Sequence, residues 1–228
     1  MARHAGTRKS RQSEPDDVFV AQVLHFGKWA EAHQQVLTVI GVVVAVAVLG
    51  MVYYRNYRTN LDQQAAAQLE QVYQSVSIQD MEGARGQLAT FLERFGGTAY
   101  EAEARLLLGE LYLRDGAPQQ AQAVLRPLGA SPRAPIEFQA AALLAAALEE
   151  DRQWSDAEDI YMTIANRSDL DFQVRDALTA AARIRHDRGD LGGAVELYQR
   201  LADELEAGDP RRGVYEMRIQ EIESASSA

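Results

Sequence analysis

The side chains best suited to metal or acid–base chemistry are the four histidines and the acidic residues beside them. His186 and Asp187 are neighbours, a pairing also found in metal-dependent phosphohydrolases. That chemistry needs several more ligands at defined spacing. The other histidines are His4, His25 and His33, all near the N-terminus. The sequence therefore does not favour a metal site.

Other catalytic patterns are missing from the sequence. It has no cysteine, which excludes disulfides, thiolate nucleophiles and cysteine-based metal centres. The stretch Gly83–Gly86 lacks the Lys-Ser/Thr of a phosphate-binding loop, and there is no Gly-x-Ser-x-Gly elbow for a serine hydrolase. The acidic pairs Asp16-Asp17 and Glu149-Glu150 are typical of solvated helix faces. We predict a protein that is not an enzyme and needs no cofactor, with a cryptic enzyme as the least favoured alternative.

Charge is distributed unevenly along the chain. Residues 1–58 carry 7 Lys and Arg against 4 Asp and Glu, whereas residues 59–228 carry 16 against 29, giving net charges of +3 and −13. Affinity for nucleic acid comes largely from cations that displace counterions from phosphates. A strongly acidic domain repels that backbone, so we predict no nucleic-acid partner.

One segment is too apolar for a globular surface. Val36–Tyr54 is a run of 19 residues without a charge. As a helix it would be about 28 Å long, close to the ~30 Å hydrocarbon core of a bilayer. Trp29 precedes the run, and Tyr53 and Tyr57 lie at its other end, as expected for side chains at the membrane interface. We predict a transmembrane helix over residues 36–54.

Two alternatives to a transmembrane helix are a buried core helix and a cleaved signal peptide. A buried core helix rarely stays apolar around its whole circumference over this length. A cleaved signal peptide is suggested by the small residues Ala45–Ala47, but the apolar run continues to Tyr54 and 35 residues precede it. An uncleaved anchor fits better than either alternative.

Basic residues on the two sides of the anchor predict its orientation. Arg3, Arg8, Lys9, Arg11 and Lys28 precede the span, whereas Arg55 and Arg58 follow it closely. Because the side richer in Lys and Arg stays in the cytoplasm, we expect the N-terminus inside, although the bias reverses within the nearest turns. Residues 1–35 are then a basic disordered tail that ends in either an amphipathic juxtamembrane helix or a plain extension. Residues 55–61 are expected to be a linker to the domain of residues 62–228.

The domain after the anchor repeats with a period of 36 or 37 residues. The repeat is marked by Ala84, Ala121, Ala157 and Ala194. Apolar residues follow each alanine at +4 and +7, and a small residue stands twelve positions before the last three. This spacing predicts antiparallel helix pairs whose backbones approach at the small residues. We expect an all-α solenoid of about four hairpins, closed by a capping helix near residues 211–223.

Turn and cap residues add detail to this prediction. Gly116 and Gly189 stand five residues before their alanines and suit a left-handed helix end. Thr98 with Glu101, and Ser155 with Glu158, have the spacing of a capping box. The sequence therefore predicts helix starts at these two places.

The repeats resemble the tetratricopeptide repeat family over roughly residues 62–205. The clearest unit is 102–135, whose matching residues are Leu108, Gly109, Tyr112, Gly116, Ala121 and Leu125. The unit around Ala157 also matches, with Arg152 where glycine is usual. The unit around Ala194 has Arg185 where an aromatic is usual, and the unit around Ala84 keeps only its second helix.

The whole arrangement also resembles a more specific family. A basic N-terminal segment, one membrane helix and a small acidic repeat domain are similar to the YfgM-like ancillary subunits of the bacterial Sec translocon. The stretch 91–113 is similar to that family's junction between its second and third repeats. The resemblance implies an inner-membrane protein with periplasmic repeats, whose partners are translocon subunits, periplasmic chaperones or secreted chains. A structural adaptor of another envelope complex is the alternative.

The tetratricopeptide resemblance also implies a binding groove. In that family the first helix of each repeat lines a concave face, and the corresponding residues here come from three repeats. They are Glu103, Leu106, Glu110, Leu113, Arg114, Gln139, Ala142, Ala146, Glu149, Glu150, Asp176, Thr179, Arg183, His186 and Asp187. Because they lack a dense cluster of Lys and Arg, we expect an extended or folded polypeptide partner that is not held by its terminal carboxylate. The alternative is that they are simply exposed helix residues.

Overall fold

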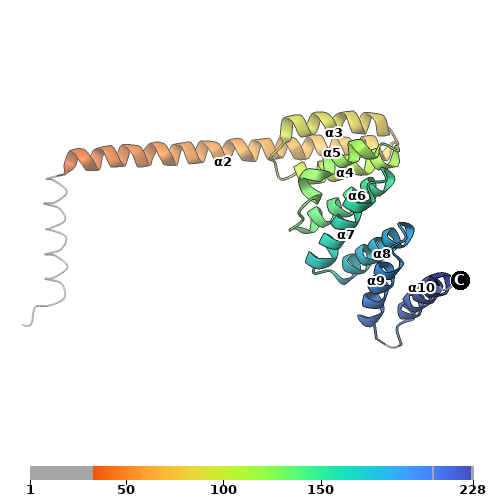
Figure 1. The fold of residues 1–228 in the computed structure, drawn as a ribbon. Coiled ribbons are helices and arrows are strands. Elements are labelled where there is room, and N and C mark those ends of the chain that lie inside the picture. The colour runs from red at the N-terminus through yellow and green to blue at the C-terminus, as the bar shows by residue number, and fades with distance from the viewer. Residues whose placement is uncertain (1–32, 207, 227–228) are drawn as a thin grey trace, which may run out of the picture. The chain divides into compact units, whose positions relative to one another are not determined.

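The computed structural model describes residues 33–206 and 208–226, and every regular element within them is a helix (Figure 1). The chain divides into two compact units, one ending at Arg58 and one beginning at Thr59. The basic tail and the juxtamembrane segment expected before residue 33 lie outside the described residues. The expected all-α architecture is confirmed for the part that is described.

The described part of the first unit begins at residue 33 and consists mainly of the N-terminal part of helix α2 (Gln34–Ser77). None of the most apolar 18-residue window of α2 is buried inside the protein. Val39 is 63% exposed and Leu49 is 69% exposed. The Thr38 hydroxyl donates a hydrogen bond to the Gln34 carbonyl oxygen at 2.8 Å, so this polar group is satisfied within the helix. Residues 55–61, where we expected a linker, are helical and belong to α2.

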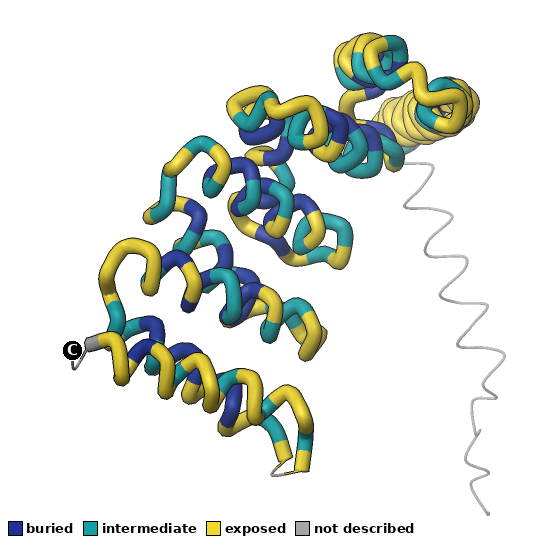
Figure 2. The backbone as a smooth tube through the Cα atoms, turned by 90° about the vertical axis from the view of Figure 1, so that its right-hand side faces the viewer, coloured by how far each residue is buried: buried dark blue, intermediate teal, exposed yellow. Residues whose placement is uncertain are grey.

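The second unit consists of helical hairpins stacked in sequence order (Figure 1). The part of α2 after Thr59 pairs with α3, and each later odd-numbered helix pairs with the helix before it. The bounds are α3 (Met81–Phe95), α4 (Glu101–Arg114), α5 (Pro118–Gly129), α6 (Pro135–Glu150), α7 (Trp154–Arg167), α8 (Asp171–Asp187), α9 (Leu191–Asp203) and α10 (Pro210–Ser226). Figure 2 shows the buried positions on the sides of these helices that face their neighbours.

Small residues stand where the helices cross, as the repeat spacing predicts. Ala84, Ala121, Ala157 and Ala194 are all fully buried. Gly109 of α4 faces α5 so closely that an added Cβ would lie 2.6 Å from the side chain of Leu125. The backbones can therefore approach because one partner in each crossing lacks a bulky side chain.

A position five residues before each alanine adopts a left-handed backbone conformation. Gly116 (φ 68°) and Gly189 (φ 83°) do so as predicted. Gln79 (φ 63°) and Arg152 (φ 60°) hold the same conformation without being glycine. All four hairpins therefore turn in the same way. In two of them the turn residue has a Cβ atom, which makes the left-handed conformation sterically unfavourable.

Both predicted capping boxes are wrong. The Thr98 hydroxyl donates to the Phe95 carbonyl at 2.7 Å, and Tyr100 is the residue that precedes α4. Ser155 lies inside α7, after Trp154, and so cannot cap it.

Aspartate caps two of the second helices instead. The side chains of Asp80 and Asp190 accept hydrogen bonds from the amides of Gly83 and Gly193, at 2.9 Å and 3.0 Å. Each aspartate directly follows a left-handed turn residue, so turn and cap form one repeated unit.

The capping helix is confirmed, with slightly wider bounds than the expected 211–223. Ile222 of α10 is 5% exposed and belongs to the core formed by the last repeats. The Tyr215 ring stacks on Tyr198 of α9 with centroids 6.3 Å apart. Helix α10 therefore covers apolar surface that the last hairpin would otherwise expose.

Candidate functional site

The residues predicted to line the groove lie on α4, α6 and α8, the first helices of their hairpins. None of the fifteen is buried, in keeping with a position on an accessible face. Helix α4 packs directly against α6, whereas a hollow opens between α6 and α8. The face is therefore continuous at one end and indented at the other.

The first hollow brings together the predicted residues Gln139, Ala142 and Asp176. Its volume is about 350 Å³ and its walls are mainly apolar. Phe138 of α6 and Phe172 of α8 also line it, and Phe172 is 54% exposed. Neither phenylalanine was predicted to belong to the groove.

The second hollow lies one repeat further on, between α8 and α10. It has a volume of about 510 Å³ and brings the predicted residues Thr179, Arg183 and His186 against Arg218 and Glu221 of α10. The sequence predicted only that the last helix closes the core, and it did not indicate that α10 lines a hollow.

A tyrosine lines each of these hollows from the second helix of the hairpin. Tyr161 and Tyr198 both stand four residues after a repeat alanine, and both are largely buried. The Tyr161 hydroxyl donates to Glu149 at 2.7 Å, and Glu149 also forms an ion pair with Arg183. Burial, with help from Glu149, raises the pKa of Tyr161, and burial raises the pKa of Tyr198. Both tyrosines therefore stay neutral, and Tyr161 helps to fix Glu149 in place.

The α4 end of the face is acidic. Glu103 accepts a hydrogen bond from the Tyr73 hydroxyl of α2. Partial burial, the bond to Glu103 and the nearby carboxylates of Glu110 and Glu70 together raise the pKa of Tyr73 to about 12. Several negative charges therefore gather at this end of the face.

Other predicted residues line neither of these two hollows. Leu106 and Leu113 pack partly against the core, and the Arg114 guanidinium lies 3.8 Å from the sulfur of Met81. Glu150 and Asp187 are exposed, and Asp187 contacts His186 at 3.1 Å. Within residues 33–206 and 208–226, no group of three His, Asp or Glu side chains is placed to hold a metal ion.

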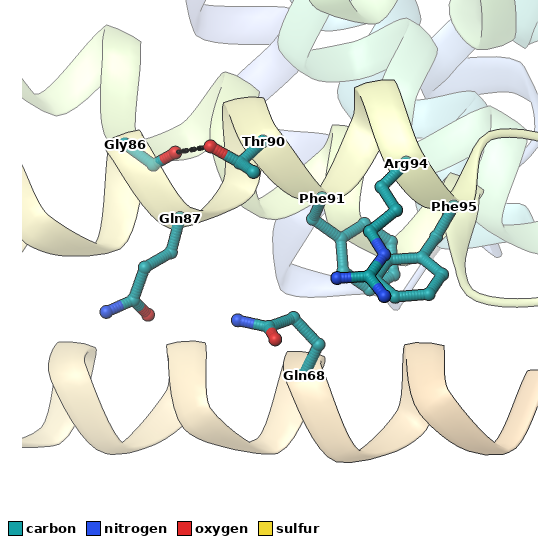
Figure 3. A pocket seen from close by; sticks show the side chains of 7 residues that line it. All are labelled: Gln68, Gly86, Gln87, Thr90, Phe91, Arg94 and Phe95. Carbon is teal, nitrogen blue, oxygen red and sulfur yellow. Dashed lines mark hydrogen bonds between the residues drawn. The ribbon is translucent and has the colours of Figure 1, made fainter.

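A third hollow, of about 250 Å³, lies between α2 and α3 within the second unit (Figure 3). The amide side chains of Gln68 and Gln87 enter it from the two helices, and the Arg94 guanidinium lies 5.2 Å from the ring centroid of Phe95. It contains none of the predicted groove residues.

Polar contacts also join successive hairpins at an equivalent point. The residue after each of the first three repeat alanines reaches the residue that precedes the left-handed turn of the next hairpin. These pairs are Arg85 with Asp115, Gln122 with Asp151 (3.2 Å) and Glu158 with Arg188 (3.2 Å). Arg185, which stands where an aromatic is usual, also binds Glu158 at 2.7 Å.

Stacked helical hairpins with an indented first-helix face define a helical-repeat protein. A family model for the tetratricopeptide repeat-like domain matches residues 28–224, and the chain belongs to this family. The nearly identical TPR-like repeats of a Podosopora anserina protein assigned as a kinesin light chain are similar in structure, with a TM-score of 0.56 and 17% identity over 73% of this chain and 88% of that one. A single-residue variant of that protein gives the same TM-score at 18% identity, with the same coverage. A comparison with curated protein sequences gives no match.

Proposed function

We propose that the protein is a membrane-tethered scaffold of the cell envelope that binds other polypeptides. Residues 36–54 of α2 cross the bilayer, the N-terminus lies in the cytoplasm, and the repeats lie on the opposite side of the inner membrane. The repeats there serve as an ancillary translocon subunit or as a chaperone cofactor for secreted chains. The family supports the binding role because TPR-like repeats are protein-interaction modules.

The observation that carries the membrane proposal is the exposure of the apolar part of α2. Val46 is 64% exposed and Leu49 is 69% exposed, on a helix with no buried residue in its most apolar window. An apolar face of this length in water would be a strong site of aggregation. Lipid satisfies it, because hydrocarbon surrounds the helix while the backbone hydrogen bonds stay internal.

Membrane extraction tests the anchor. The full chain should stay in the membrane fraction through high-salt and carbonate washes and leave it only with detergent, because screening does not weaken apolar burial. The double variant Val43→Arg, Val46→Arg should enter the soluble fraction more readily, since each charge costs about 2.5–3.5 kcal/mol at the centre of a span. Val43→Leu, Val46→Leu is the matched control. Release of the native chain by salt alone would show that it has no transmembrane anchor.

Two further experiments test the side of the membrane and the partner. A reporter that works only outside the cytoplasm should be active when fused to the C-terminus, and activity of a cytoplasm-only reporter would reverse the proposed topology. Purification in mild detergent should bring down translocon subunits. Recovery of a different envelope complex would instead favour a structural adaptor.

A further inference from the structure

The hollow between α6 and α8 differs from the other two in the chemistry of its walls. Phe138, Ile164 and Phe172 supply large apolar surfaces, and Ala142 and Ala180 leave the space between them open. The hollow between α8 and α10 is instead lined by several charged groups, among them the ion pair of Arg218 with Glu221 along α10, at 2.8 Å. The hollow between α2 and α3 has Phe91 and Phe95 in its walls, but the amides of Gln68 and Gln87 and the Arg94 guanidinium lie there too, and none of the predicted groove residues lines it. The α6–α8 hollow is therefore the best site on this face for an apolar side chain.

The walls of this hollow are themselves accessible. Gln139, Ala142, Phe172 and Asp176 are all exposed, although they line it. Small-molecule sites usually enclose most of their ligand. A depression with exposed walls instead suits one side chain of a larger partner, with the partner's backbone continuing along the first-helix face.

The charge around the hollow favours a cationic partner. Asp176 stands at its edge, and Glu103 and Glu110 lie on α4 at the acidic end of the same face. No Lys or Arg is among the residues that line the hollow, and Arg183, a cation of the same face, is held by Glu149. The whole repeat domain carries a net charge of −13, which attracts a basic chain from a distance as well.

Resting on the proposed binding function, we infer that the first-helix face binds an extended, basic polypeptide segment whose aromatic or large aliphatic side chain enters the α6–α8 hollow. Lysine or arginine residues of that segment contact Asp176 and the carboxylates of α4. The apolar side chain provides most of the affinity, and the charges provide orientation and a faster encounter.

Fluorescently labelled peptides of equal length test this inference on the full chain in detergent. The first peptide is lysine-rich with phenylalanine, the second replaces phenylalanine with serine, and the third replaces lysine with aspartate. The first peptide should bind. The second should bind more weakly by about tenfold or more, because it has no aromatic side chain to bury in the hollow. The third should bind more weakly by about tenfold or more, because its charges are repelled by the carboxylates of the face. Added salt should weaken binding of the first peptide.

Two substitutions locate the site. Ala142→Leu fills the hollow and should weaken binding of the first peptide by about tenfold. Asp176→Asn should weaken it less and reduce its salt dependence. The controls are Ala123→Leu and Asp159→Asn, at exposed positions of α5 and α7 outside the hollow, and they should leave binding unchanged.

The inference is overturned if no peptide binds, if the aspartate peptide binds as well as the lysine peptide, or if Ala142→Leu has no effect. The proposed envelope role is judged separately, by membrane extraction and co-purification.

Discussion

Gly129, the last residue of α5, provides the sharpest test of how tightly consecutive hairpins pack. An added Cβ would lie 2.8 Å from the Ala140 carbonyl oxygen and equally close to the Cα and N of Ala141, all backbone atoms of α6. Ordinary van der Waals contact for such a carbon begins near 3.4 Å. Because a helix backbone cannot rotate aside as a side chain can, Gly129→Ala must push α5 and α6 apart.

The expected cost of Gly129→Ala is about 1–3 kcal/mol, the usual range for overpacking a core. For a domain of this size, each kcal/mol shifts the thermal midpoint by about 2–4 °C. The midpoint should therefore fall by several degrees when unfolding of the full chain is followed by circular dichroism in detergent.

Gly86→Ala is the matched control for this experiment. Gly86 lies within α3, and an added Cβ there meets nothing within 4 Å. Both substitutions change the unfolded chain in the same way, so the difference between them reports on the folded state. Gly86→Ala should raise stability by about 0.5–1 kcal/mol, because alanine favours the helix. If Gly129→Ala proves as stable as Gly86→Ala, the close approach of α5 and α6 is wrong.

Three further predictions concern the repeat register, the turns and the caps, each measured as a change in thermal midpoint. Ala121→Leu should destabilise the domain by about 1–3 kcal/mol, because it overpacks a buried helix crossing. Ala123→Leu, at an exposed position, should change the stability little. Equal effects of the two substitutions would contradict the predicted repeat register. Gly189→Ala should lower the free energy of unfolding by about 1 kcal/mol through backbone strain alone, since an added Cβ there meets no neighbouring atom. Arg152→Gly should be neutral or stabilising, because glycine relieves the same strain. A loss of stability in Arg152→Gly would show that the contacts of the arginine side chain matter more than its backbone conformation. Asp190→Ala should cost about 0.5–2 kcal/mol through loss of the cap on α9, and Asp190→Asn should restore most of it.

The repeat architecture was readable because its signal is physical and periodic. Buried crossings accept only small side chains, so the spacing from Ala84 to Ala194 marked the second helices. The turns were only half visible, because a left-handed residue is evident in a sequence only when it is glycine. Gln79 adopts that conformation without any such mark, and only the family resemblance placed Arg152 at a turn position. The caps were not evident because a capping box is marked by Ser or Thr with Glu, whereas Asp80 and Asp190 cap helices that have glycine at the third position.

The candidate site was predictable in outline and less so in its chemistry. Family offsets placed Gln139, Ala142 and Asp176 on one face, and they line a single hollow. Phe138 and Phe172 were missed because an aromatic residue in an amphipathic helix usually belongs to the core, and periodicity alone does not tell a core position from an exposed groove wall. The hollow also depends on the separation of α6 and α8, a tertiary property that no local pattern encodes.

The polar contacts between hairpins also give the repeats a fixed order. Arg85 meets Asp115 at one junction, whereas Glu158 meets Arg188 at the last, so the sign of the charge is reversed. Docking the first hairpin on the fourth would bring Arg85 against Arg188, and docking the third on the second would bring Glu158 against Asp115. Both arrangements set like charges together, which disfavours skipped or exchanged hairpins during folding and between neighbouring molecules at high local density.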